Sequence, residues 1–120
     1  MLSLHTEKIG EMAIIECEGR IVRSDAAFKL REAVNSQKDA RLIVLDLTEV
    51  PVIDGGGLGM LGFLRRWAID HDIRLKLFNP HQSVRDRLEH VSSLGEFDIA
   101  TLDEMSALLE RAYPYNAMAA

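Results

Sequence analysis

The segment that decides the fold is residues 46–59, DLTEVPVIDGGGLG, near the middle of a chain of 120 residues. It overlaps the run RLIVLDL at 41–47, whose apolar residues are consecutive rather than alternate, as in a strand covered on both faces of a parallel sheet. It leads into residues 58–71, which are rich in helix formers and contain no proline. The sequence therefore predicts a central strand followed by a helix that starts at the glycines.

Three consecutive glycines, Gly55, Gly56 and Gly57, stand at this junction. Glycine lets the backbone adopt positive φ and approach another group closely, and the start of a helix offers free N–H donors with partial positive charge. The junction is therefore predicted to dock an anion or a partner. We expect Asp54 to hold N–H groups of this loop and Asp46 to end its strand. An acid–base pair of these two carboxylates is the less favoured interpretation.

Strand and helix patterns alternate on both sides of this segment. Their alternation after an N-terminal hairpin favours right-handed crossovers between parallel strands. The prediction is a single small α/β domain at 1–112, with a mixed, largely parallel sheet of four or five strands and about four helices, followed by a flexible tail at 113–120. Strands are predicted at 2–5, 12–17, 41–47, 73–78 and 97–99, and helices at 25–37, 58–71, 82–91 and after the capping box 101–104.

The composition argues against several classes of function. Fourteen Lys and Arg against nineteen Asp and Glu give a formal charge of −5, which disfavours a nucleic-acid partner and attraction to anionic membranes. The apolar runs are far shorter than the roughly 18 residues of a membrane span, and no N-terminal signal is seen, so the cytoplasm is the expected location. The single cysteine, Cys17, cannot form an internal disulfide and is predicted to be an inert core residue.

Gly57, Gly59 and Gly62 fit the spacing of a dinucleotide-binding fingerprint. However, Asn79 stands where a ribose-binding carboxylate is expected, and the chain leaves no room for a second mononucleotide-binding half. Close helix packing at Gly59 and Gly62 is therefore the preferred interpretation, and no cofactor is predicted.

No metal site or catalytic centre is predicted either. The histidines fall on four separate elements without the spacing of metal ligands. No nucleophile and base can be paired from chain order, so the protein is predicted not to be an enzyme. The histidines are His5, His71, His81 and His90.

The helix at 58–71 carries a second apolar stripe beside its core face. Leu58, Leu61, Ala68 and Ile69 are expected on the core face, whereas the second stripe is Met60, Phe63 and Trp67. The favoured interpretation buries both stripes against the sheet and a neighbouring helix. The alternative is that Met60 and Phe63 form an exposed patch for a partner. Arg65 and Arg66 are expected to be solvated rather than to grip a partner.

The central segment resembles the STAS family, of the anti-sigma factor antagonist type. The family pattern is an apolar strand, Asp-Leu-Ser/Thr, a short stretch, Asp-Ser-Ser/Ala-Gly-Leu-Gly and then a helix, which DLTEVPVIDGGGLG matches. The sequences GRIV at 19–22 and LKLFNPHQSVRDRL at 75–88 also resemble the family, and the likeness covers about residues 2–111. It implies a non-catalytic switch protein that binds a serine-kinase-type anti-sigma factor and so acts in transcription regulation.

The chain departs from this pattern where the family is phosphorylated. Gly55 and Gly56 occupy the positions of the family's serines, so no phosphoacceptor is predicted there, and Val22 replaces an aspartate that many members carry. In members that carry a serine there, a phosphate in the interface would weaken binding, because its charge repels the partner and must be desolvated. The expected outcome is constitutive binding, or a signal through expression level or another residue. The predicted partner-binding residues are Asp54, Gly55, Gly56, Gly57, Leu58, Met60 and Phe63.

Two other functions stay open. One is a STAS-like accessory subunit of a membrane transporter, which would purify with a permease or an ATPase rather than with a kinase-like protein. The other is a small nucleotide-binding domain, which a thermal shift with ATP, GTP or NAD would reveal. The oligomeric state is not predicted.

Overall fold

The computed structural model describes residues 2–22, 25–90 and 97–112, which form a five-stranded sheet in the order β1-β2-β3-β4-β5. β1 and β2 form the predicted antiparallel hairpin, and β2 to β5 run parallel. β3, which precedes the glycines, is the middle strand, as predicted. The strands are β1 (Leu2–Ile9), β2 (Met12–Gly19), β3 (Leu42–Glu49), β4 (Arg74–Phe78) and β5 (Ile99–Ala100), and the helices are α1 (Asp25–Asn35), α2 (Gly55–Asp70), α3 (Gln82–His90) and α4 (Leu102–Ala112).

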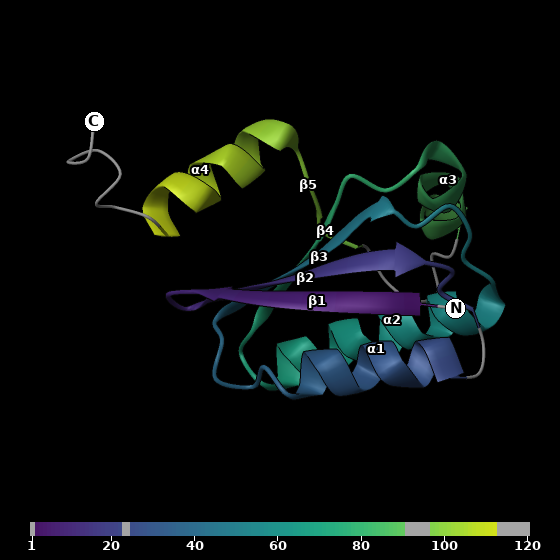
Figure 1. The fold of residues 1–120 in the computed structure, drawn as a ribbon, viewed down its shortest axis with the longest axis horizontal. Helices are drawn as coiled ribbons and strands as arrows, with labels where there is room; N and C mark the ends of the chain where they lie inside the picture. Colours follow the sequence, from purple (N-terminus) through teal and green to yellow (C-terminus); the bar gives the residue numbers. More distant parts are fainter. Residues whose placement is uncertain (1, 23–24, 91–96, 113–120) are drawn as a thin grey trace.

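The helices cover both faces of this sheet (Figure 1). α1 and α2 lie together on one face, over an apolar cluster that includes the fully buried Ile15, Ile43 and Leu45. α4 lies on the opposite face, where Met105 packs with Val44 in a smaller cluster. Because both faces of β3 are covered, its consecutive apolar residues are explained, and the predicted α/β architecture is confirmed.

α2 is held on the sheet by an apolar stripe with the three- and four-residue spacing of one helix face. Burying each leucine of this stripe stabilises the fold by about 1.5–3 kcal/mol. The prediction that Ile69 belongs to this face is wrong, because its side chain is 50% exposed. It follows Ala68 and is therefore rotated by about 100° away from the sheet. The buried stripe consists of Leu58, Leu61, Leu64 and Ala68.

Some predicted boundaries differ from the structure. Asp46 does not end its strand, because β3 continues to Glu49, which pairs with Glu18 after an irregularity in the ladder. β5 is Ile99–Ala100 rather than 97–99, since its pairing with β4 begins opposite Leu77. The predicted tail at 113–120 lies outside the described residues.

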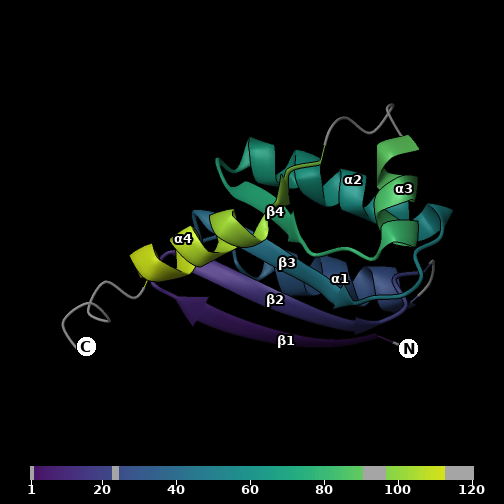
Figure 2. The same cartoon turned by 90° about the horizontal axis from the view of Figure 1, so that it is seen from above.

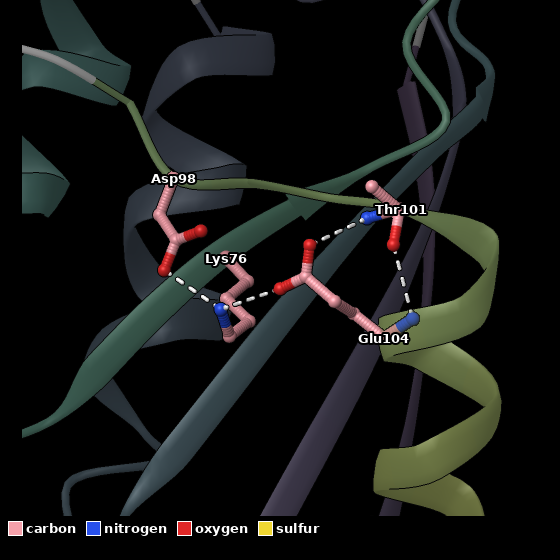
Figure 3. A network of polar contacts seen from close by, with 4 residues as sticks. All are labelled: Lys76, Asp98, Thr101 and Glu104. Atoms are coloured by element: carbon pink, nitrogen blue, oxygen red, sulfur yellow. Dashed lines mark hydrogen bonds and ion pairs between the residues drawn. The ribbon is translucent and has the colours of Figure 1, made fainter.

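α4 is tied to the sheet by a polar network (Figure 3). The N–H of Glu104 donates to Thr101 Oγ1 at 3.0 Å, and the N–H of Thr101 donates to the Glu104 carboxylate at 3.2 Å, so the predicted capping box is confirmed. The Lys76 ammonium on β4 lies 2.8 Å from Asp98 and 3.5 Å from Glu104. Lys76 is buried, and an unpaired buried charge is strongly destabilising, so these carboxylates hold β4, β5 and α4 together.

Candidate partner-binding site at the start of α2

Asp54 caps the first turn of α2. Its backbone is extended, with φ −105° and ψ −176°, and its Oδ1 accepts a hydrogen bond of 2.8 Å from the N–H of Gly57. This confirms that Asp54 holds an N–H group of the glycine segment. A carboxylate at the N-cap stabilises a helix by about 1 kcal/mol and places negative charge where a bound phosphate would sit. The helix start is therefore better suited to a protein partner than to an anionic cofactor.

Gly57 lies where two segments of backbone are in close contact. The N–H of Ile21 donates to the carbonyl of Val52 at 3.1 Å, and the N–H of Asp54 donates to the carbonyl of Ile21 at 3.3 Å. This bridge presses Ile21 against the first turn of α2. A Cβ on Gly57 would overlap the carbonyl oxygen of Ile21 and lie 2.8 Å from Ile53 Cγ1. Sequence pattern does not reveal this contact, because it joins two segments that are far apart in the chain.

The other glycines behave differently from the predictions. The expected positive φ is not found at the glycine segment, because all three glycines are in helical conformation, and positive φ occurs instead at Gly10 and Gly19. Close packing does not explain Gly59, because a Cβ there would have nothing within 4 Å. Gly55 is also exposed with open space around it. At the start of α2, Gly55 and Gly59 therefore present backbone without a side chain to solvent.

The residues of the second apolar stripe of α2 differ in burial. Met60 and Trp67 are half-buried and pack against the larger apolar cluster, as the favoured interpretation required. Phe63 is 47% exposed, so for this residue the favoured interpretation is wrong, and its role in binding a partner stays a prediction.

Phe63 is part of an aromatic patch, which we define as Phe28, Arg31 and Phe63. The Arg31 guanidinium lies 5.5 Å from the centre of the Phe63 ring, within the range of a cation–π contact. Phe28 is 55% exposed and is three residues from Arg31 on α1, so the two share one helix face. Phe28 was not predicted to be exposed. Its position outside the apolar spacing of α1 is the sequence signal that could have indicated it.

A second polar cluster at the ends of β3 and β4 is structural. Thr48 Oγ1 donates to Asp46 Oδ1 at 2.6 Å and accepts from Asn79 Nδ2 at 3.1 Å. His81 Nε2 donates to the Thr48 carbonyl at 2.7 Å. Asp46 is thus engaged by its own strand, as Asp54 is by α2, and nothing in these contacts makes the two carboxylates an acid–base pair. Asn79 adopts a φ of 52°, a conformation that asparagine tolerates well.

The remaining residues considered for chemistry are a buried cysteine, a surface arginine and possible metal ligands. Cys17 is 2% exposed, and its burial, with the nearby charge of Asp46, raises the pKa of the thiol to about 12. Such a thiol is unreactive near neutral pH, as predicted. The exposed Arg66 lies 3.4 Å from Asp70 one turn later, a surface pair with little energetic weight. Within residues 2–22, 25–90 and 97–112, no three His, Cys, Asp or Glu side chains converge as metal ligands would.

In the same described ranges, every helix is too short or too polar to cross a lipid bilayer.

Known structures share this fold. SpoIIAA, an anti-sigma factor antagonist, in its unphosphorylated form superposes with a TM-score of 0.68 at 18% identity, over 91% of this chain and 98% of that one. An anti-sigma factor antagonist from Mycobacterium paratuberculosis gives 0.66 at 17% identity, over 91% and 95%. Murine Solute Carrier 26 family member A9, an anion transporter, gives 0.66 at 16% identity, over 88% of this chain and 18% of that one.

No curated protein sequence matches the chain. The family model described as the STAS domain matches residues 3–107, which include the hairpin, the capped start of α2 and most of α4. That match spans most of the 120 residues and agrees with the superposed structures in fold. The chain belongs to the STAS domain family.

Proposed function

We propose that this protein is a non-catalytic interaction module of the anti-sigma factor antagonist type, which binds a serine-kinase-type anti-sigma factor in transcription regulation. The observation that carries the proposal is the start of α2, where Gly55 presents backbone to solvent and the neighbouring Gly56 is half-buried and has no side chain. Support also comes from the shared fold with SpoIIAA and with the mycobacterial antagonist.

The chemistry of this surface suits a protein partner. Aromatic and arginine side chains are the residues that most often dominate binding energy at interfaces, and the aromatic patch offers both. Val52, just before α2, is 39% exposed and adds apolar area beside the helix start. The absence of side chains at Gly55 and Gly56 lets a partner's backbone come close. These features place exposed apolar and aromatic side chains and a glycine without a side chain on α1, on α2 and on the residues just before α2.

SpoIIAA, which shares this fold, is known in a phosphorylated and an unphosphorylated form. Gly55 and Gly56 carry no hydroxyl, so no phosphate can be added at the start of α2. We propose that binding is constitutive, or that it responds to expression level or to another residue. Incubation with ATP and the partner kinase, followed by intact mass measurement, tests this proposal. A phosphate on this chain would contradict constitutive binding and would favour a signal through another residue.

The partner is identified by affinity capture and mass spectrometry with the wild-type chain as bait. Gly55→Trp is the matched negative bait, because Gly55 has open space around it and a bulky side chain there fits the fold. Ser106→Trp places the same bulk on the exposed side of α4 and is the positive control. We expect a kinase-like protein that is captured by the wild type and by Ser106→Trp and lost with Gly55→Trp. Capture that survives Gly55→Trp would contradict the proposed surface.

A second candidate function is an accessory role with a membrane transporter. It is favoured by the superposition on the anion transporter, in which the matched part is 18% of the chain. The same capture experiment separates the two functions, because recovery of a permease or a transport ATPase in place of a kinase-like protein supports this one. The nucleotide-binding alternative is weakened by the Asp54 carboxylate at the helix start, and a thermal shift with ATP, GTP or NAD tests it.

A further inference from the structure

The outer edge of β1 is an open strand edge of eight residues. β1 is the first strand in the sheet order, and within the described ranges nothing pairs with its outer side. Figure 2 shows β1 along the margin of the sheet, with α1 behind the sheet and not beside the strand. Exposed strand edges readily pair with another strand, and long ones are uncommon in proteins that stay monomeric. This edge therefore needs an occupant or a reason to stay unpaired.

The hairpin determines which backbone groups face outward. Ile9 pairs with Met12 across a two-residue turn, so the odd-numbered residues of β1 exchange hydrogen bonds with β2. The even-numbered residues then direct their N–H and C=O groups away from the sheet. Lys29 Nζ donates to the outward carbonyl of Leu2 at 2.9 Å, which agrees with this assignment and covers that end of the edge. The outward-facing residues left without a described backbone partner are Leu4, Thr6 and Lys8.

We propose that β1 pairs with β1 of a second copy of this chain, antiparallel and about a two-fold axis at Thr6. In this register Leu4 of each copy lies opposite Lys8 of the other, and Thr6 lies opposite Thr6. All three are hydrogen-bonded pairs, which gives about six N–H···O bonds across the axis. The Leu2 carbonyl falls outside the paired region and keeps its bond to Lys29. The two sheets then become one continuous sheet, with a closed two-fold interface.

The side chains of β1 favour this register by charge complementarity. His5 and Glu7 are both exposed, and each lies opposite the other residue of the second copy, once on either side of the axis. They occupy non-hydrogen-bonded positions, where side chains across two strands are closest. The imidazole can donate an N–H to the carboxylate whether or not it is protonated. An axis at Glu7 would instead place two carboxylates opposite each other, and an axis at Lys8 two ammonium groups, which is destabilising.

The pairing is independent of the partner-binding surface. β2 and β3 separate β1 from β4 in the sheet. α2 packs against α1 and β4, not against β1. A dimer joined through β1 therefore keeps the start of α2 accessible in both copies. The inference does not rest on the proposed function, because a dimer can form whether or not an anti-sigma factor is the partner.

The test is sedimentation velocity of the whole chain over a wide concentration range, up to millimolar. We expect a species of 13.5 kDa that converts to one of twice that mass as concentration rises. Thr6→Pro removes an outward N–H without touching a bond to β2, and proline is tolerated at such edge positions. It is expected to abolish the dimer, whereas Thr6→Val keeps the N–H and the dimer. Circular dichroism shows that each variant is folded.

Two further measurements locate the interface. Amide hydrogen exchange at Leu4, Thr6 and Lys8 is expected to slow as the dimer forms. Glu7→His alone places two imidazoles opposite each other and is expected to weaken the dimer at least severalfold. The double variant His5→Glu with Glu7→His restores opposite partners in this register and is expected to restore the dimer. A monomer at every concentration, a dimer that survives Thr6→Pro, or exchange that slows elsewhere would each overturn the proposal.

Discussion

Replacing Gly57 by alanine should separate packing from helix propensity at the start of α2. Alanine in a helix is ordinarily about 0.5–1 kcal/mol more favourable than glycine. At Gly57, however, the new Cβ meets the backbone carbonyl of Ile21, which cannot rotate away as a side chain would. The segment that carries Ile21 must therefore move away from α2.

The cost follows from what this movement disturbs. Overpacking costs about 1–3 kcal/mol, and loss of the hydrogen bond from Asp54 to the Ile21 carbonyl costs about 0.5–1.5 kcal/mol. After the propensity gain is subtracted, Gly57→Ala is expected to be destabilising by about 0.5–4 kcal/mol. Gly55→Ala is the matched control, because its Cβ meets nothing within 4 Å and only the propensity gain remains.

Urea unfolding followed by far-UV circular dichroism measures both free energies. We expect a lower midpoint for Gly57→Ala and an unchanged or slightly higher one for Gly55→Ala. Equal stability of the two variants would refute the close contact between Ile21 and α2.

Three other predictions concern single side chains. Phe63→Ala should weaken capture of the partner by about tenfold or more, while the melting temperature changes little because the ring is 47% exposed, and titration calorimetry with a melting curve checks both. Asp54→Ala should lower the free energy of unfolding by about 1 kcal/mol through loss of the N-cap, whereas Asp54→Asn should retain most of it in the same urea assay. For Cys17 the pKa is raised from 9.0 to about 12, so the unfolded chain loses the proton first, and stability should fall by about 1.4 kcal/mol per pH unit as pH rises above 9.0. The free energy of unfolding of Cys17→Val should not show this part of the decrease with pH, which urea unfolding curves between about pH 8 and 11 measure. An equal decrease in the wild type and in Cys17→Val would contradict the assignment to Cys17.

Local pattern was sufficient for much of the fold. The consecutive apolar residues of β3, the capping box of α4 and the alternation of the hairpin each depend on neighbours within a few residues, and each prediction is confirmed. Boundaries failed where pairing partners decide them, as at β5, whose extent depends on its register with β4.

The candidate site was predictable only in part. Asp54 and the glycines were singled out because residue type and order carry the signal of a helix start. The aromatic patch was not found as a unit, because it joins Phe28 and Arg31 of α1 to Phe63 of α2.

The sequence by itself determined the order of the elements, the capped glycine start of α2 and the lack of a hydroxyl there, because these depend on the chemistry of adjacent residues. Only the tertiary structure decided which of the three consecutive glycines lies against another backbone segment, which aromatic rings face solvent and which strand edge is open. Those properties arise where segments distant in the chain meet, and the space left at such contacts is set by the packing of both sides.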